Sequence, residues 1–285
     1  MNGQRMERLW LAALAVMLLM GCEEAPFGKS EIDQPDRQSI YGRIRLDRDA
    51  DAAGVYVWLQ GTPLSAFTDA GGEFQLRLAD SNIGHSLLIG GVYRLYFYVA
   101  NYGLESAEVL IQNGRFLYQK GDVDRNGRLA RPGVMRKRLV IETEVQPASV
   151  ASDFQGDVRI RLTLWATDDS VTVVFPKMIG NSLGVVLLQH LGTDSVYTEL
   201  SDIDTQNTFT AKIGREMQTW EMMMEIFPGR LPPGRYRVIP FLFIQDPQVP
   251  EGLLESLGGN WRAPGRDYLR IPFKRHDAIL EIQPN

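Results

Sequence analysis

The chain has 285 residues, of which 44% are hydrophobic and 23% charged, and its net charge is −5. This composition excludes a wholly disordered chain, and at about 150 residues per domain the length predicts about two domains. The single cysteine excludes a disulfide within the chain. The acidic balance argues against a nucleic-acid partner, because such a partner calls for a basic face that neutralises phosphates.

The amino-terminal segment has the pattern of a signal peptide. Arg5 and Arg8 precede an apolar run, Leu9–Leu19, that is too short to span a bilayer comfortably. The run ends in Leu19-Met20-Gly21-Cys22, which resembles the lipobox of bacterial lipoproteins and contains the chain's only cysteine. The alternatives are an ordinary signal peptide with an incidental cysteine, or a short hydrophobic anchor.

The lipobox resemblance implies cleavage after residues 1–21, a diacylglyceryl group on the Cys22 thiol and acylation of the new amino terminus. Two or three acyl chains hold a protein stably at a membrane. Residues 22–38 are polar and contain proline and glycine, which predicts a disordered tether. In Gram-negative lipoproteins an aspartate after the cysteine commonly retains the protein at the inner membrane, so Glu23 favours the outer membrane.

From Ile40 onward the hydrophobic period is two, which is typical of half-buried strands. Asp69-Ala70-Gly71-Gly72 suits a tight turn between two of these runs, because its glycines tolerate positive φ. Several short strands at this spacing predict a β-sandwich. The predicted strands of the first half are Ile40–Leu46, Val55–Leu59, Phe74–Leu78 and Tyr93–Val99.

Three segments of this half resemble the carboxypeptidase regulatory-like domain, a transthyretin-like β-sandwich. They are Gly54–Leu59, Thr68–Phe74 and Gly91–Leu95, followed by Asn101-Tyr102-Gly103. The resemblance covers about residues 39–112, with an extension to Val145 open, and the predicted sandwich is 39–145. In that family the domain is accessory, without catalytic residues, and no carboxypeptidase domain accompanies it here.

A loose stretch at residues 146–153 predicts the boundary to a second β-sandwich, residues 154–285. Residues 156–245 loosely resemble the bacterial proteinase-inhibitor-type immunoglobulin-like sandwich. One face of a predicted strand carries Trp220, Met222, Met224 and Ile226, and the other carries Glu221, Met223 and Glu225, which favours core packing of the methionines over a cofactor site. Further strands are predicted at Val158–Trp165, Val171–Pro176, Arg235–Val238, Tyr268–Phe273 and Ala278–Ile282. The fold class expected is therefore all-β, with two tandem sandwiches.

A long irregular stretch follows Ile244 and is rich in proline and glycine. Irregular stretches of this length inside a compact domain are uncommon and often functional. Trp261 in this stretch is the candidate for an exposed binding contact, and the alternative is a tryptophan folded back onto the edge of the sandwich.

The sequence motifs that could indicate a catalytic site match only weakly. Gly180–Gly184 places Ser182 in a nucleophile-elbow pattern, but the β-rich context lacks the strand-to-helix setting that an esterase site needs. His85, His190 and His276 show no zinc-ligand spacing. We therefore expect a non-enzymatic protein, with no catalytic residue.

One metal site remains a candidate. Asp122, Asp124 and Asn126 stand at the spacing that opens a calcium loop and resemble the start of a dockerin or EF-hand loop. The twelfth position, where a bidentate glutamate belongs, is Gly133. The alternative is an Asp/Asn/Gly turn held by its own side-chain hydrogen bonds. Calcium is thus the one cofactor considered, beside the covalent lipid on Cys22.

The function expected from the sequence is that of a lipid-anchored cell-envelope module that binds or assembles with an envelope protein or glycan, without catalysis. The runner-up is an exported proteinase inhibitor or accessory subunit of an envelope hydrolase. A third reading, an esterase that uses Ser182, predicts ester turnover.

Overall fold

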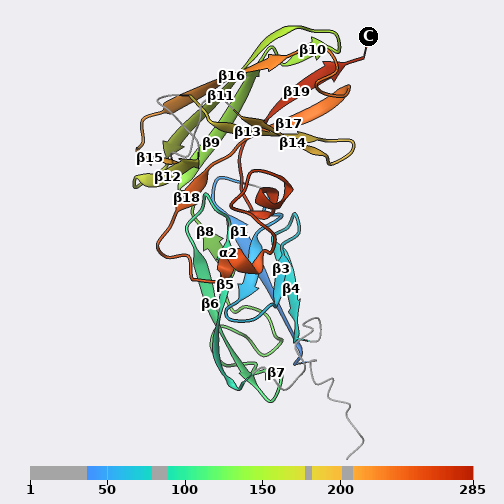
Figure 1. Ribbon diagram of the computed structural model, residues 1–285. Helices are drawn as coiled ribbons and strands as arrows, with labels where there is room; N and C mark the ends of the chain where they lie inside the picture. Colours follow the sequence, from blue (N-terminus) through green and yellow to red (C-terminus); the bar gives the residue numbers. More distant parts are fainter. Residues whose placement is uncertain (1–36, 50, 79–88, 177–181, 201–207, 285) are drawn as a thin grey trace, which may run out of the picture. The chain divides into compact units, whose positions relative to one another are not determined.

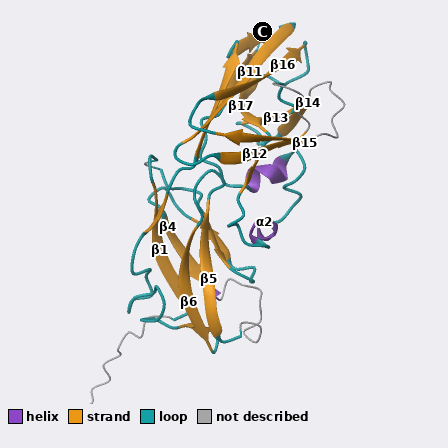
Figure 2. Cartoon of the chain, turned by 90° about the vertical axis from the view of Figure 1, so that its left-hand side faces the viewer, coloured by secondary structure: helices purple, strands orange, loops and turns teal. Residues whose placement is uncertain are grey.

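The fold comes from a computed structural model that describes residues 37–49, 51–78, 89–176, 182–200 and 208–284. Residues 1–36, with the predicted signal peptide, Cys22 and most of the tether, lie outside the described residues. Strands form almost all of the regular structure (Figures 1 and 2), which confirms the all-β prediction. No helix of the described part has the length and apolar character needed to cross a bilayer.

The first sandwich packs a three-stranded sheet on a five-stranded sheet (Figure 1). Alternation explains the arrangement: in β4, Phe74 and Leu76 are buried while their neighbours are exposed. The sheet β4-β1-β8 contains Glu73–Arg77, Ser39–Leu46 and Gly133–Met135, and the sheet β3-β2-β5-β6-β7 contains Ser65–Phe67, Tyr56–Leu59, Gly91–Tyr98, Glu105–Gln112 and Arg115–Phe116.

The second sandwich encloses its own core between three sheets. Met222 and Met224 of β16 are buried and Met223 is exposed, which confirms the strand prediction for the methionine run. The sheets are β16-β11-β9 (Gln218–Ile226, Gly156–Ala166, Leu139–Gln146), β15-β12-β18 (Thr208–Ile213, Val171–Pro176, Phe243–Gln245) and β10-β19-β17-β13-β14 (Ser149–Ala151, Ala278–Gln283, Gly234–Pro240, Val185–His190, Val196–Leu200).

The second sandwich begins earlier in the chain than the sequence predicts. Strand β9 pairs with β11 from Ala166↔Leu139 to Arg159↔Gln146, and Leu139 and Ile141 lie in the second core. A boundary at 146–153, with 39–145 as one sandwich, is therefore wrong. The irregular sequence at residues 146–153 lies between β9 and β11, which are strands of the same sandwich. It therefore does not mark the passage from one sandwich to the other.

Two strands are buried on both faces and meet at the junction of the sandwiches. All residues of β2 are buried, as are the first four of β13, Val185–Leu188. One face of each strand packs in its own core, and the other joins a third apolar cluster. Continuous apolar runs are the expected signature of strands covered on both sides.

That third cluster is completed by residues 246–277, which we call the return segment. It contains the short helix α2, Leu253–Ser256, and the 3₁₀-helix η2, Arg266–Arg270. The predicted strand at Tyr268–Phe273 is therefore wrong. Tyr268 lies within η2 and Ile271 follows the helix with an extended backbone, and both side chains are buried in the third cluster.

Candidate functional site

The two sandwiches are joined through the side chain of Asn101, which is fully buried. Its amide nitrogen donates to the carbonyl oxygens of Leu139, at 3.0 Å, and Lys274, at 2.7 Å. Its amide oxygen accepts the N–H of Lys274 at 3.0 Å, and its backbone carbonyl accepts the N–H groups of Arg138 and Leu139. One residue thus ties the first sandwich to the start of β9 and to the return segment.

Beside this junction lies a cleft of about 670 Å³, which we call the junction cleft. Ligand pockets commonly have volumes of a few hundred to a thousand cubic ångströms and place a few polar groups among apolar walls. The first sandwich contributes Tyr56, Ser65 and Phe67 to the lining, the second contributes Gln189, Arg237 and Ile239, and the return segment contributes Ser256, Arg270, Phe273, Lys274, Arg275 and Asp277, among others.

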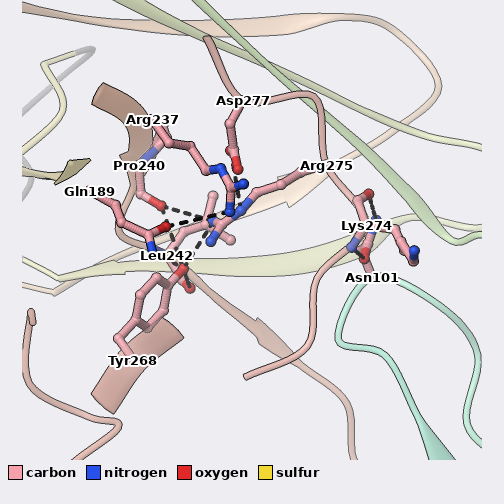
Figure 3. A network of polar contacts seen from close by, with 9 residues as sticks. All are labelled: Asn101, Gln189, Arg237, Pro240, Leu242, Tyr268, Lys274, Arg275 and Asp277. Carbon is pink, nitrogen blue, oxygen red and sulfur yellow. Dashed lines mark hydrogen bonds and ion pairs between the residues drawn. The ribbon is translucent and has the colours of Figure 1, made fainter. Parts of the chain in front are cut away.

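The lining is basic, although the chain as a whole is acidic. Four of its side chains are cationic and one is anionic. Lys274 pairs with Asp51 at 3.1 Å, and Arg270 pairs with Asp267 at 3.3 Å. Arg237 on β17 has no carboxylate within ion-pair distance in the described part of the chain, and Figure 3 shows it beside Gln189 and the Arg275 cluster.

Arg275 is built into the wall of the cleft, with only 7% of its side chain exposed. Its guanidinium donates towards Pro240 O at 3.4 Å and Tyr268 Oη at 3.5 Å, and lies 4.7 Å from the Phe273 ring centroid (Figure 3). Burial opposes its charge, but Tyr268 and Asp277 outweigh burial and raise its pKa. Arg275 therefore stays cationic, held by aromatic faces and a carboxylate.

Asp277 is the acidic partner in this wall. Its Oδ1 atom lies 3.2 Å from Arg275 Nε, and its side chain is 12% exposed. Burial raises the pKa of Asp277, while Arg275, Arg237 and His276 act to lower it. Oδ1 makes no hydrogen bond of good geometry in the described structure, so this carboxylate is held mainly by charge.

Tyr268 fixes the return segment against the second sandwich. Its hydroxyl donates to Leu242 O at 2.9 Å and accepts the Leu242 N–H at 3.3 Å. Its ring also packs edge-on against Phe241 and Phe243, at centroid distances of 4.6 and 5.7 Å. This part of the cleft wall is therefore preorganised, because packing, hydrogen bonds and an ion pair hold Tyr268, Arg275 and Asp277.

The structure places Trp261, the predicted exposed contact, in the interior. Its side chain is 8% exposed, its ring packs edge-on against Phe243 at 5.9 Å, and the Arg262 guanidinium lies 4.1 Å from its centroid. The prediction of an exposed contact is wrong, and the alternative, a tryptophan folded back onto the sandwich, is what the structure shows. The amphipathic ring gains more by filling the third cluster than by facing water.

The candidate calcium residues form a hydrogen-bonded turn. Asp122 Oδ2 accepts the N–H of Glu108 at 2.7 Å, and Asp124 Oδ1 accepts the N–H groups of Asn126, at 2.7 Å, and Arg128, at 2.9 Å. The described residues contain no group of three or more His, Cys, Asp or Glu side chains placed to hold a metal. These contacts support the turn alternative, and calcium binding stays a prediction.

The residues of the esterase reading are not brought together. Ser182 forms an isolated β-bridge with Glu221. His190 Nδ1 accepts the N–H groups of Gly192 and Thr193, and His276 lies 3.4 Å from Glu142. His85, Gly180 and Asn181 lie outside the described residues. No described contact joins Ser182 to a histidine, and the absence of catalysis stays a prediction.

Sequence reasoning missed the junction cleft because its members come from distant parts of the chain. Two local signals were available. Val185–Leu188 is a continuous apolar run, which indicates a strand covered on both faces. Lys274–Asp277 places two cations, a histidine and a carboxylate directly before the last strand. Neither signal reveals that the return segment folds back over the first sandwich.

No protein-family model matches the chain, and no curated protein matches it. Among solved structures, a mutant type II cohesin–X-dockerin complex from Acetivibrio cellulolyticus matches 35% of this chain and 58% of its own, with 23% identity and a TM-score of 0.24. The TIE protein of Bacillus anthracis matches 73% of this chain and 48% of its own, with 9% identity and a TM-score of 0.23. The chain thus spans about half the length of either structure, and the carboxypeptidase regulatory-like resemblance stays a prediction.

Proposed function

We propose that the protein is a lipid-anchored module of the cell envelope that binds a protein partner in its junction cleft, without catalysis. The observation that carries the proposal is the lining of this cleft: a cationic wall fixed by Arg275, Asp277 and Tyr268, with Arg237, which forms no ion pair in the described part of the chain, at its surface. Rigid elements that present a few charged groups beside aromatic side chains are suited to recognition.

The anchor rests on the sequence alone. The lipobox-like Leu19-Met20-Gly21-Cys22 supports acylation of Cys22, and Glu23 supports sorting to the outer membrane in a Gram-negative cell. Acyl chains at the end of a polar tether would hold the sandwiches at the membrane and leave the cleft available to an envelope partner.

The experiment is site-specific photocrosslinking in the envelope of cells that make the protein. A photoreactive phenylalanine replaces Phe67, which is 53% exposed at the cleft, or Met217, which is 68% exposed and does not line the cleft. We expect one reproducible crosslinked protein from the Phe67 position and none from the Met217 position. Mass spectrometry of the same sample should show an acylated peptide that begins at Cys22.

Two results would contradict the proposal. Equal crosslinking from both positions, or none from the Phe67 position, would remove the cleft as the binding site. An unmodified Cys22 in the mature protein would remove the anchor. A Cys22→Ala variant exported by a non-lipoprotein signal serves as the control for anchoring, because it leaves every residue of the cleft unchanged.

A further inference from the structure

The strand β3 borders the junction cleft and ends its sheet. It is the terminal strand of β3-β2-β5-β6-β7, and two of its three residues, Ser65 and Phe67, line the cleft. Phe67 stands 53% exposed, with its ring centroid 5.1 Å from that of Tyr56. An exposed aromatic side chain on an edge strand is an unusual surface for a monomeric protein, because a strand edge without a neighbour invites pairing with another chain.

The register shows which backbone groups of β3 are free. Leu59 N donates to Leu64 O, and Thr68 N donates to Val55 O. Hydrogen-bonded pairs alternate along an antiparallel ladder, so between these two pairs the bonded one is Val57↔Ala66. The N–H and C=O groups of Ser65 and Phe67 therefore point away from β2, and no described residue bonds them.

The charge of the neighbouring wall decides what kind of strand would fit there. The lining has four cations and one carboxylate, and Arg237 forms no ion pair in the described part of the chain, while the carboxylate of Asp277 is already paired with Arg275. A side chain that projects from an added strand onto the face shared with Phe67 would enter this cationic cleft. Carboxylates fit it, and lysine or arginine side chains would be repelled.

We propose that the junction cleft binds an extended acidic peptide of the partner, which adds a strand to the free edge of β3 and places a carboxylate on Arg237. Backbone hydrogen bonds to Ser65 and Phe67 supply sequence-independent affinity, and the cleft supplies the preference for acidic side chains. A glycan is the less favoured occupant, because it offers no matching row of N–H and C=O groups to a strand edge. The inference rests on the proposed function and deepens it.

The test is selection from a display library of random peptides about twelve residues long, against the purified, detergent-solubilised protein, followed by titration calorimetry of the enriched peptides. We expect enriched peptides to contain Asp or Glu within a stretch that alternates with apolar residues. Arg237→Gln should weaken their binding about tenfold, which corresponds to about 1.4 kcal/mol. The matched control is Arg235→Gln, which lies two residues away on the same exposed face of β17 but outside the cleft, and should leave binding within about twofold.

Backbone pairing is tested separately by N-methylation of each residue of one enriched peptide. Methyl groups on the alternate nitrogens that face β3 should abolish binding, and those on the intervening nitrogens should have little effect. Enrichment of no peptide, enrichment of neutral or basic peptides, binding unchanged by Arg237→Gln, or binding indifferent to methylation would each overturn the inference. If the Phe67 crosslinker still captures a partner in those cases, the proposed function stands and only the acidic-strand mode fails.

Discussion

Asn101 concentrates the polar contacts of the junction in one buried side chain. Asn101→Ala would leave the carbonyls of Leu139 and Lys274 and the N–H of Lys274 without their partner. Each unsatisfied buried group costs about 1–3 kcal/mol, so we expect the variant to lose about 3 kcal/mol of unfolding free energy. Urea denaturation followed by tryptophan fluorescence measures this loss.

The control for that experiment is Asn126→Ala. Asn126 is exposed, and its side chain makes none of the hydrogen bonds of its turn. Exposed substitutions of this kind usually change stability by no more than about 0.5 kcal/mol. If both variants lose the same free energy, Asn101 does not hold the junction.

Glu199 on β14 links stability to pH. Its side chain is 8% exposed and pairs with Arg230; burial raises its pKa above the ordinary 4.5, and Arg230 only partly opposes this. Because the folded state favours the protonated carboxyl group, Glu199 stabilises the fold fully below pH 4.5. This stabilisation is lost as the pH rises through the pKa of Glu199 in the folded protein. Glutamine does not titrate, so the stability of Glu199→Gln relative to the wild type should increase between about pH 4 and about pH 7.

Urea denaturation of both proteins across this pH range checks the sign. A relative stability that falls with rising pH would show that the ion pair with Arg230 outweighs the burial of the carboxylate. A constant difference would show that the carboxyl group titrates alike in the folded and unfolded chains.

At the scale of elements, the return segment acts as a packed layer. Trp261 fills the third apolar cluster with Phe243, so Trp261→Ala should cost about 3–5 kcal/mol, as for other buried large-to-small substitutions. Met217→Ala, at a 68% exposed position, is the control and should cost about 0.5 kcal/mol or less. Thermal unfolding of the two variants distinguishes a structural Trp261 from a surface contact, for which both losses would be small.

A substitution in the turn at Asp122–Arg128 distinguishes a structural role of this turn from a metal-binding role. Asp124→Ala removes the acceptor of two backbone N–H groups, so we expect a loss of about 1–2 kcal/mol. The loss should be the same with calcium and with a chelator, because the hydrogen bonds need no ion. A midpoint of unfolding that rises with calcium in the wild type, but not in Asp124→Ala, would instead establish the calcium site.

Local pattern predicted most strands, and it failed where long-range contacts decided the structure. Where apolar and polar residues alternate, as around Phe74 and Leu76, the sequence directly predicts a strand with one buried face. The stretch Tyr268–Phe273 has similar local chemistry, but the structure forms a 3₁₀-helix over Arg266–Arg270, in which the Tyr268 hydroxyl bonds the backbone of Leu242 in the second sandwich. The cleft could not be predicted, because Arg237 and Phe67 are 170 residues apart in the sequence and line one cleft only through long-range packing.

At the scale of the whole molecule, the passage between the sandwiches is short and hydrogen-bonded to both of them. Only residues 136–138 separate β8 from β9. The Lys137 N–H donates to the Asp47 carboxylate in the first sandwich, and the Lys137 carbonyl accepts the hydroxyl of Thr167 from the second. Residues 37–285 accordingly form one compact unit, which contains both walls of the junction cleft.

This continuity predicts that the two sandwiches unfold together. The third apolar cluster draws residues from β2 and from β13, so the unfolding of either sandwich exposes apolar surface of the other. We expect hydrogen exchange at Leu95 of β5 and at Leu162 of β11, each fully buried in its own core, to accelerate at the same urea concentration. Loss of protection at clearly separate concentrations would show that the sandwiches are independent, and a cleft between independent parts would lose the preorganisation on which recognition by Arg237 depends.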